Sequence, residues 1–180
     1  IVFANTNSIG LVPRATGTSL AGQCVGNDII VDISKHFTNI IDFDPVTKTV
    51  TVQPGVIRDE LNEFLKPYGL FFGPNTSTSN RCTIGGMVGN NSSGTTSIQY
   101  GVTRDKVLSI TGYLSDASEV TFSKLSKTAF SEKIQLQTLE GKIYHKLYDM
   151  LSNVGNRENI IKEFPNPKIH RRNTGYALDA

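Results

Sequence analysis

Short apolar runs separated by turn residues fill the first third of the chain. The run Ile9–Arg14 leads into a loop, and Asp28–Ile33 is rich in β-branched side chains, so both are typical of buried strands. Two further runs, Asn39–Phe43 and Thr49–Gln53, flank Asp44–Thr47, which carries proline at its second position, as a β-turn favours. The pattern predicts two core strands followed by a β-hairpin.

The hydrophobic period then lengthens to that of a helix. One helical face carries the apolar residues Ile57, Leu61, Phe64 and Leu65. Pro67 and Gly69 predict the end of this helix. The three apolar residues that follow, Leu70–Phe72, predict a short strand.

The second half of the chain predicts another hairpin and then helices. Residues 107–122 have the pattern of paired strands that turn at Ser115–Ser118. From about Ser126 the pattern is helical, and apolar residues recur at Leu139, Ile143, Leu147, Leu151 and Val154. Thr138 is the expected N-cap and Gly155 the expected stop. This order of elements indicates an α+β protein rather than a strictly alternating doubly wound sheet.

Composition narrows the class of protein. The 180 residues include 18 basic and 16 acidic ones, with a net charge of +2, whereas a nucleic-acid-binding surface needs a basic stripe. No apolar run approaches the ~20 residues of a membrane span. The two cysteines, Cys24 and Cys82, fit a reducing compartment, and the three histidines are scattered. We expect a cytoplasmic protein with no metal site, no membrane span and no nucleic-acid partner.

The ends of the sequence predict that it is a piece of a longer protein. It lacks an initiator methionine, and residues 1–14 have the pattern of the last turns of a helix running into a strand. The chain closes on "RRNTGYALDA" without a stop or cap signal. A targeting signal at a true N-terminus would therefore not be visible.

Two segments poor in large side chains carry the candidate chemistry. They read "PRATGTSLAGQ" at residues 13–23 and "CTIGGMVGNNSSGTTS" at residues 82–97. Small residues let backbone N–H groups approach a ligand closely, and successive amides form an anion-binding concavity. Polar side chains add further donors at Thr16, Thr18, Ser19, Asn90, Asn91, Ser92 and Ser93. The expected guest is a phosphate or pyrophosphate.

Two common nucleotide loops do not fit these segments. A Walker A loop needs a lysine where Gln23 stands, so an NTPase is rejected. The second segment lacks the glycine spacing of a dinucleotide-binding fingerprint. Either segment alone also fits an ordinary Gly/Ser surface loop. Together they suit a long ligand with phosphates in the middle and rings at both ends.

At these residues the chain resembles the FAD-linked oxidases of the vanillyl-alcohol oxidase / p-cresol methylhydroxylase (PCMH) type. The first segment is similar to that family's pyrophosphate loop, P-x-R-G-G-G-T-S-L-x-G. The second resembles its signature P-D-P-S-S…T-I-G-G-x-x-x-x-N-A-G-G…Y-G-x-T-x-D-x-V. The matching residues are Pro74, Ser77, Thr83, Ile84, Gly85, Gly86, Asn91, Gly94, Tyr100, Gly101, Thr103, Asp105 and Val107. The resemblance spans about residues 9–122.

The resemblance implies a PCMH-type α+β fold of two small mixed subdomains, truncated at both ends. The first subdomain is expected over residues 1–70 and holds the pyrophosphate loop. The second is expected over residues 71–125. Residues 126–180 are expected to form a helical insertion and the start of a segment that closes the flavin site.

FAD is the cofactor that the resemblance implies, with both segments holding it. The implied FAD-binding residues are Arg14, Ala15, Thr16, Gly17, Thr18, Ser19, Leu20, Gln23, Pro74, Ser77, Thr83, Gly85, Gly86, Gly89, Asn90, Asn91, Ser93 and Gly94. No catalytic residue and no metal ligand is expected in this piece. Arg14 either faces a phosphate or supports the loop from behind, and we favour the second.

The first segment departs from the family pattern at two positions. Ala15 and Thr16 stand where the family has glycines, and their β-carbons forbid some left-handed conformations. The Thr16 hydroxyl could donate to the ligand in exchange. After Asn91, serines replace the family's Ala-Gly. Cys82 beside the second segment is expected to be a small buried residue rather than a redox group.

Within the family the chain is most similar to the D-lactate, glycolate and D-2-hydroxyglutarate dehydrogenases, through "NTGYALD" at residues 173–179. This similarity implies that the full-length protein oxidises a small D-2-hydroxy acid by hydride transfer from the α-carbon to flavin N5. The piece alone is expected to be inactive. "NNSSG" and the helical insertion resemble members fused to iron–sulfur domains, which implies an iron–sulfur domain or subunit as electron acceptor.

Two alternatives stay open at this point. One is an NADPH-dependent flavin reductase of the enolpyruvyl-reductase type, and the other is a non-catalytic module that binds phosphate or a partner protein. A basic cluster at His170–Arg172 is expected in a solvated loop, with a position near an anionic substrate as the other interpretation.

Overall fold

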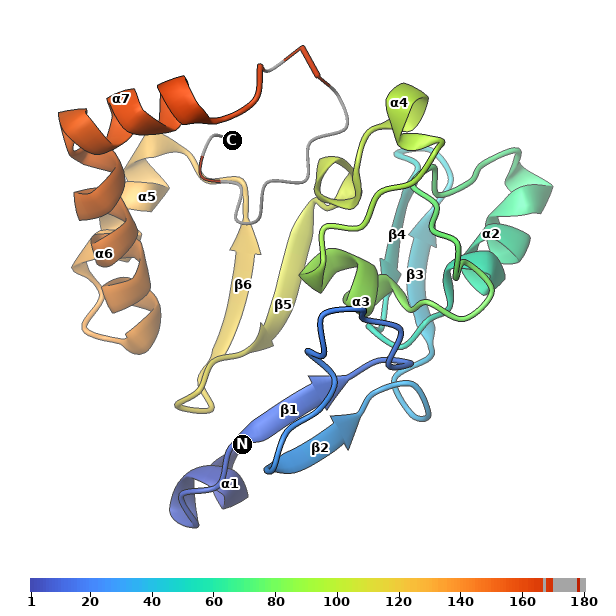
Figure 1. Ribbon diagram of the computed structural model, residues 1–180, viewed down its shortest axis with the longest axis horizontal. Helices are drawn as coiled ribbons and strands as arrows, with labels where there is room; N and C mark the ends of the chain where they lie inside the picture. The colour runs from blue at the N-terminus through green and yellow to red at the C-terminus, as the bar shows by residue number, and fades with distance from the viewer. Residues whose placement is uncertain (167, 170–177, 179–180) are drawn as a thin grey trace. The chain divides into compact units, whose positions relative to one another are not determined.

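The computed structural model describes residues 1–166, 168, 169 and 178. Contacts between α-carbons divide the chain into two compact units (Figure 1). The loop unit, which carries both small-residue segments, is Asn7–Lys106, and the helical unit joins Ile1–Thr6 to Val107–Ala180. The predicted division, with subdomains at residues 1–70 and 71–125 and a helical insertion with the start of a closing segment at residues 126–180, is a different one, and it stays a prediction.

The loop unit begins with two parallel strands, β1 (Leu11–Arg14) and β2 (Ile29–Asp32). Both confirm the strands predicted there. Parallel strands need a long connection, and residues 15–28 provide it, including most of the first small-residue segment. The register pairs Arg14 with Asp32, so the strand ends place these opposite charges side by side where that segment begins.

The predicted hairpin follows as β3 (Ile40–Asp44) and β4 (Thr49–Val52), which pair antiparallel. Its turn is held by the Asp44 carboxylate, which accepts from the Val46 amide over 2.8 Å and from the Thr47 hydroxyl over 2.7 Å. Such Asx turns explain why the turn forms where the sequence places an aspartate before proline.

Helix α2 (Arg58–Leu65) packs its predicted apolar face against the hairpin and continues into the 3-10 helix η1 (Lys66–Tyr68). Gly69 ends it in the left-handed conformation, with φ of 68°, as glycine permits. The core of the unit consists of Val56, Leu61 and Leu65, with Ile40, Phe43, Val50, Val52, Phe64, Leu70, Phe72 and Ile84 packed around them.

The strand predicted at Leu70–Phe72 is wrong. The Leu70 amide donates back to the Leu65 carbonyl over 3.3 Å, and the Phe72 amide donates to the Asn62 side chain over 2.7 Å. Helix α2 and its side chains therefore take the hydrogen bonds that a strand partner would have satisfied.

Three short helices complete the loop unit: α3 (Ile84–Gly89), α4 (Ser97–Tyr100) and the 3-10 helix η2 (Thr103–Lys106). The second small-residue segment is therefore partly helical. Gly101 adopts a φ of 78°, and the amide of Val102 donates to the Asp105 carboxylate over 2.8 Å. Gly101 and Asp105, which belong to the Y-G-x-T-x-D stretch of the resemblance, thus stabilise the fold of this part of the chain.

The helical unit contains α1 (Val2–Thr6), an antiparallel hairpin and three further helices. The hairpin, β5 (Ser109–Tyr113) and β6 (Glu119–Ser123), turns where predicted, with Ala117 left-handed. Helices α5 (Lys127–Gln135), α6 (Leu139–Ser152) and α7 (Val154–Glu163) follow. Aromatic rings join them to the hairpin, because Tyr144 lies against both Phe122 and Phe130.

The predicted cap of α6 is confirmed and its predicted stop is wrong. Thr138 accepts a hydrogen bond from the Gly141 amide over 3.2 Å. Gly155 lies inside α7, because Asn153 takes an extended conformation and caps α7 by accepting from the Asn156 amide over 3.0 Å. An N-cap side chain can end one helix by starting the next. The basic cluster at 170–172 and most of the "NTGYALD" stretch lie outside the described residues.

Across the residues that the structure describes, no helix combines the length and the apolar character needed to cross a membrane.

We expect Leu61→Ala to lower the free energy of unfolding by about 2–5 kcal/mol, since it opens a cavity in the core of the loop unit. Leu61 is 1% exposed. Denaturant titration followed by circular dichroism measures the change. Val46→Ala, at a turn residue that is 87% exposed, is the control and should change stability little. Equal effects of the two substitutions would contradict the assigned core.

Candidate functional site

The first small-residue segment leaves β1 as an exposed loop. Positive φ angles occur at Gly17 (69°) and Gly22 (75°), and not at Ala15 or Thr16. The two residues that replace family glycines therefore stand where a β-carbon is tolerated. Glycine is retained at the two positions whose conformation requires it.

The amides of this loop have few partners within the protein. Across residues 15–25, in the described part of the chain, the one backbone N–H that donates to a backbone carbonyl is that of Val25, which bonds to Gly22 over 3.2 Å. A backbone donor without a protein partner must bond to water or to a ligand. The loop thus presents a row of N–H groups that an anion can accept from.

An open hollow of about 440 Å³ lies beside this loop. It is lined by Arg14, Ala15, Thr16, Gly17, Cys24, Val25, Asp32 and Ser34. The lining comes from the loop and from the carboxyl ends of β1 and β2. The β1–β2 pairing therefore places the residues of the strand ends beside the loop.

A charged network forms part of the lining of the hollow. The Arg14 guanidinium donates to Asp32 Oδ2 over 2.8 Å, while Asp32 Oδ1 accepts from the Ser34 hydroxyl over 2.6 Å and from the Ser34 amide over 2.9 Å. The Ser34 hydroxyl and amide, together with Arg14, hold the pKa of Asp32 well below its ordinary value. Arg14 is thus paired with Asp32, and its role in supporting the loop stays a prediction.

The second segment starts with a turn that caps α3. Thr83 is fully buried, and its hydroxyl accepts from the Gly86 amide over 3.1 Å. An added β-carbon at Gly85 would lie 2.5 Å from the Pro54 side chain. Glycine at position 85 is therefore required by close packing of α3 on the chain that precedes α2.

The two segments meet directly. The Thr16 hydroxyl donates to the Arg81 carbonyl over 2.9 Å, although the two residues are 65 positions apart. A β-carbon built on Gly86 would lie 3.2 Å from the β-carbon of Ala15. Residues predicted from two separate motifs are therefore neighbours in one unit.

The rest of the second segment is held by hydrogen bonds with η2 and by close packing. The Thr103 hydroxyl donates to the Ser92 carbonyl over 2.6 Å, and the Arg104 amide donates to the Asn91 side chain over 3.0 Å. A β-carbon on Gly94 would collide with the Asn75 carbonyl. These groups shape the segment around residues 73–75.

The remaining predicted residues differ in exposure. Pro74 is fully buried, and its carbonyl accepts from Arg58 Nε over 3.2 Å. The side chain of Ser93 is half-buried, and the exposed positions are Thr18, Ser19, Leu20, Gln23, Ser77, Gly89 and Asn90. The structure therefore brings Ala15, Thr16, Gly86 and the start of α3 together, while Ser19 and Leu20 extend into solvent.

Motif-based reasoning missed Asp32, Ser34, Arg81 and Asn75. One signal was available for Asp32: two neighbouring strands each end in a charge of opposite sign, "PR" and "VD". Arg81 takes part through its backbone carbonyl, which no residue pattern reveals.

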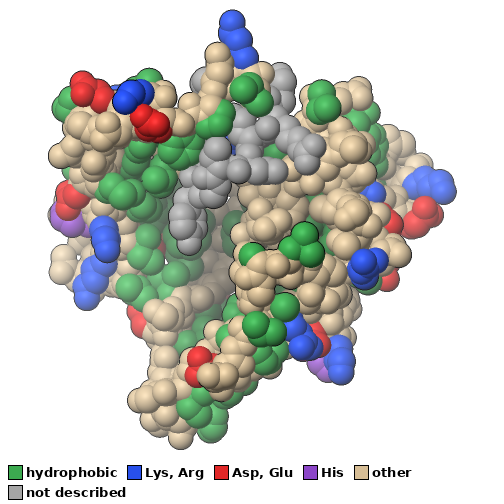
Figure 2. Space-filling view, viewed as in Figure 1, with side chains coloured by type: hydrophobic (Ala, Val, Ile, Leu, Met, Phe, Trp, Pro, Cys, Tyr) green, Lys and Arg blue, Asp and Glu red, His purple; other side chains and the backbone are tan. Residues whose placement is uncertain are grey.

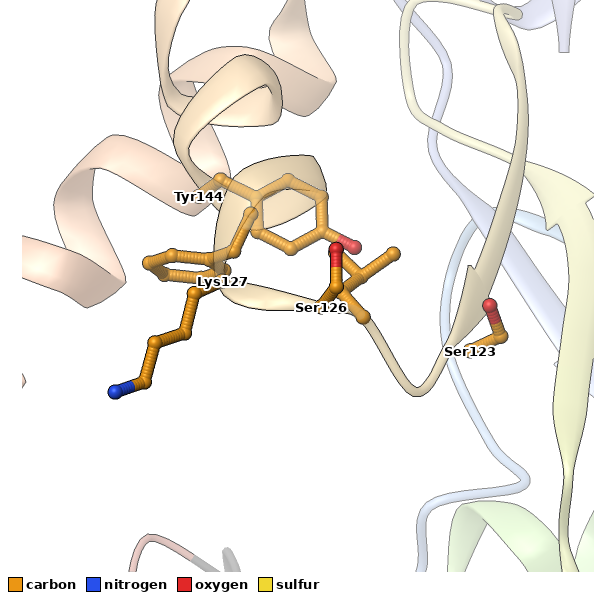
Figure 3. Close-up of a pocket in the computed structure, with 6 residues that line it drawn as sticks. Ser123, Ser126, Lys127 and Tyr144 are labelled. Atoms are coloured by element: carbon orange, nitrogen blue, oxygen red, sulfur yellow. The ribbon is translucent and has the colours of Figure 1, made fainter.

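A second hollow, of about 350 Å³, lies in the helical unit between β6, α5 and α6. Figure 3 shows that the Lys127 amino group points away from the Tyr144 hydroxyl, so the polar groups here do not converge. Such convergence is what a specific ligand site needs.

Charges on the protein surface are mixed. On the face in Figure 2, basic and acidic side chains are interspersed. Among the described residues, no three His, Cys, Asp or Glu side chains group as a metal site would require.

Comparison with known proteins gives a family match and several relatives. A family model described as "FAD binding domain" matches residues 1–123. The D-2-hydroxyglutarate dehydrogenase of Haemophilus influenzae is 40% identical over 173 residues, which cover 95% of this chain and 17% of that protein. The D-2-hydroxyglutarate dehydrogenase of Escherichia coli is 39% identical over 172 residues, which cover 96% and 16%. The chain thus spans about a sixth of the length of these relatives.

A solved structure shares the fold. The carbohydrate oxidase from Microdochium nivale superposes with a TM-score of 0.60 over 67% of this chain and 26% of its own, at 22% sequence identity. This likeness, together with the mixed helices and short sheets, confirms the predicted α+β fold.

We expect Asp32→Asn to remove a pH-dependent part of the stability. Folding lowers the pKa of Asp32 from its ordinary value of 3.8, so its carboxylate stabilises the folded state above that pH and loses this effect as the pH falls below it. The unfolding free energy of the variant should be lower at pH ~7 and should fall less steeply below about pH 4. Denaturant titrations across this range measure both slopes. Parallel curves for the two proteins would show that Asp32 is not engaged as described. Glu63→Gln is the control, because the Glu63 side chain is 75% exposed.

Proposed function

Because the chain belongs to the FAD binding domain family, we propose that it forms most of the cofactor-binding domain of a flavin-dependent oxidoreductase that acts on a small D-2-hydroxy acid. The observation that carries the proposal is that Ala15 lies next to Gly86 of the second segment and Thr16 bonds to Arg81, the residue just before that segment, beside a row of unpaired amides. A long ligand with a central diphosphate suits this arrangement.

The residues present fit FAD. The backbone amides of residues 15–24 supply donors to a diphosphate, and they need a partner that the described protein does not provide. Gly86 leaves open the space that a side chain would fill next to Ala15. The Arg14–Asp32 pair neutralises the carboxylate that lines the same hollow, which lowers the repulsion that it would exert on phosphates.

In this proposal the amides of residues 15–20 and Gln23 would hold the pyrophosphate. Ser77 and the second segment, with Gly85, Gly86, Gly89, Asn90, Asn91, Ser93 and Gly94, would hold the rest of the cofactor. Pro74 and Thr83 shape that segment from inside, since both are buried. When bound, FAD supplies the acceptor for the hydride of the substrate.

The substrate class rests on the relatives. The two D-2-hydroxyglutarate dehydrogenases described above match nearly the whole chain. Because the chain spans about a sixth of their length, the groups that bind the substrate carboxylate are proposed to lie elsewhere in the full-length protein. An iron–sulfur domain or subunit as electron acceptor is supported by "NNSSG" at residues 90–94 and the helical insertion after it, which resemble members that carry one. A cytoplasmic location is supported by the two free cysteines, Cys24 and Cys82.

We expect the full-length protein to purify with FAD and to oxidise D-2-hydroxy acids. Heat release followed by chromatography should identify FAD rather than FMN, because FMN would leave the pyrophosphate loop unused. Anaerobic addition of D-2-hydroxyglutarate or D-lactate should bleach the flavin absorbance, and the L-isomers serve as controls. A flavin that no D-2-hydroxy acid bleaches would refute the substrate class and leave FAD binding intact. Recovery of FMN alone would refute the FAD assignment.

We expect Gly86→Val to weaken FAD binding at least tenfold in the full-length protein while the apoprotein still folds. Gly86 lies in α3 without a positive φ, so the reason is space and not backbone conformation: its β-carbon would already lie 3.2 Å from that of Ala15. The two further methyl groups of valine would press on the first segment. Titration with FAD, followed by flavin fluorescence, gives the affinity.

The matched control for this substitution is Gly112→Val. A β-carbon at Gly112 meets nothing within 4 Å, and valine is favoured in a strand such as β5. FAD affinity should be unchanged there. Normal FAD affinity in both variants would show that Gly86 does not border the cofactor.

A further inference from the structure

We propose that Thr16 is a positioning residue whose side chain fastens the first small-residue segment to the turn that leads into the second before FAD binds. The inference rests on the proposed function, because it concerns how this chain prepares the FAD site. It assigns a role to one of the two residues that depart from the family's glycines.

The hydroxyl of Thr16 is already engaged inside the protein. It donates to the Arg81 carbonyl over 2.9 Å. A threonine hydroxyl carries a single proton, so this group is not the donor to the ligand that the sequence suggested. Thr16 can still present its backbone amide to the cofactor, since that amide is among the unpaired ones of the loop.

The acceptor belongs to a firmly held turn. The Arg81 amide donates to the Thr78 carbonyl over 2.9 Å, and the Cys82 amide donates to the same carbonyl over 2.7 Å. The Cys82 carbonyl in turn accepts from the Arg58 amide, at the start of α2, over 3.0 Å. The Thr16 hydroxyl is therefore tied to a turn that is anchored to α2 on one side and leads into α3 on the other.

The first segment itself has little else to hold it. Its side chains are exposed from Thr16 to Gln23, and Gly17 and Gly22 have the freedom of residues without a β-carbon. Arg14 is held by Asp32 at the start of the segment, but from residue 16 to residue 24, within the described part of the chain, the other side-chain tether is the weak contact of Cys24 Sγ with the Gly17 carbonyl at 3.9 Å. Binding must order such a loop, and the lost freedom reduces the affinity.

Thr16 lowers this entropic penalty in two ways. Its β-branched side chain narrows the backbone freedom that a glycine would have. Its hydrogen bond holds the loop where Ala15 lies next to the Gly86 position. A glycine at position 16 would offer neither effect, so the tether is a property of this sequence and not of the family pattern.

The test compares Thr16→Val with Thr16→Ser in the full-length protein. Valine keeps the size and branching and removes the hydroxyl, whereas serine keeps the hydroxyl. We expect Thr16→Val to weaken FAD binding by about three- to tenfold, the effect of one neutral hydrogen bond, and Thr16→Ser to bind within about twofold of the wild type. Flavin fluorescence titration measures both, and Thr16→Ala, which also loses the branching, is a second probe that should lose at least as much as valine.

Limited proteolysis of the apoprotein separates positioning from a general loss of stability. In Thr16→Val a protease that cuts next to the exposed Leu20 should cleave the loop faster, while the melting temperature of the apoprotein stays unchanged. Thr47→Val is the matched control, since it also removes an exposed hydroxyl hydrogen bond, here to Asp44 over 2.7 Å, and it should leave FAD affinity unchanged.

The outcomes are distinct. Unchanged FAD affinity in Thr16→Val, or an equal loss in Thr16→Ser, overturns the inference and leaves the proposed function intact. A lower melting temperature with unchanged cleavage next to Leu20 also overturns it, because the role would then be structural. Failure of the wild-type protein to bind FAD at all overturns the proposed function itself.

Discussion

The parallel pairing of β1 with β2 is the constraint on which the candidate site depends. Parallel strands cannot be joined by a tight turn, so residues 15–28 must form a long connection, and its first part leaves β1 at the same edge where β2 ends. The pairing also sets Arg14 opposite Asp32. The pairing of β1 with β2 thus determines both where the loop with its unpaired amides begins and which charge pair lies beside it.

Two glycines allow the backbone of the second segment to lie close to its neighbours, including the first segment. Gly85 lets α3 pack on Pro54, and Gly86 leaves room beside Ala15. The buried Thr83 hydroxyl caps α3 and so fixes where the helix begins. Several polar side chains of this region bond to the backbone of the protein. The backbone amides of the first loop are therefore the principal groups that can bind an anion.

In this region the side chains hold the backbone in place, and the backbone amides are the groups offered to a ligand. This arrangement suits a domain that binds a cofactor rather than one that performs the chemistry. Loop amides act as fixed dipoles, and they need no change of protonation to bind a diphosphate. Asp32 stays ionised because Ser34 and Arg14 stabilise its charge. The groups that select a hydroxy acid belong, in the proposed function, to the rest of the full-length protein.

The sequence by itself determined most of the local structure and the family. Hydrophobic period and turn residues predicted β1 to β4, α2, the β5–β6 hairpin and the Thr138 cap, because these depend on neighbours along the chain. The segments at residues 13–23 and 82–97 carried the motifs that identified the family. Only the tertiary structure decided that Leu70–Phe72 bonds to α2, that Asn153 and not Gly155 separates α6 from α7, and that Thr16 bonds to Arg81. The bonds of Leu70–Phe72 and of Thr16 form between groups that only folding brings together. The boundary between α6 and α7 depends on which of two residues, Asn153 or Gly155, ends the helix, and the residue pattern fits both.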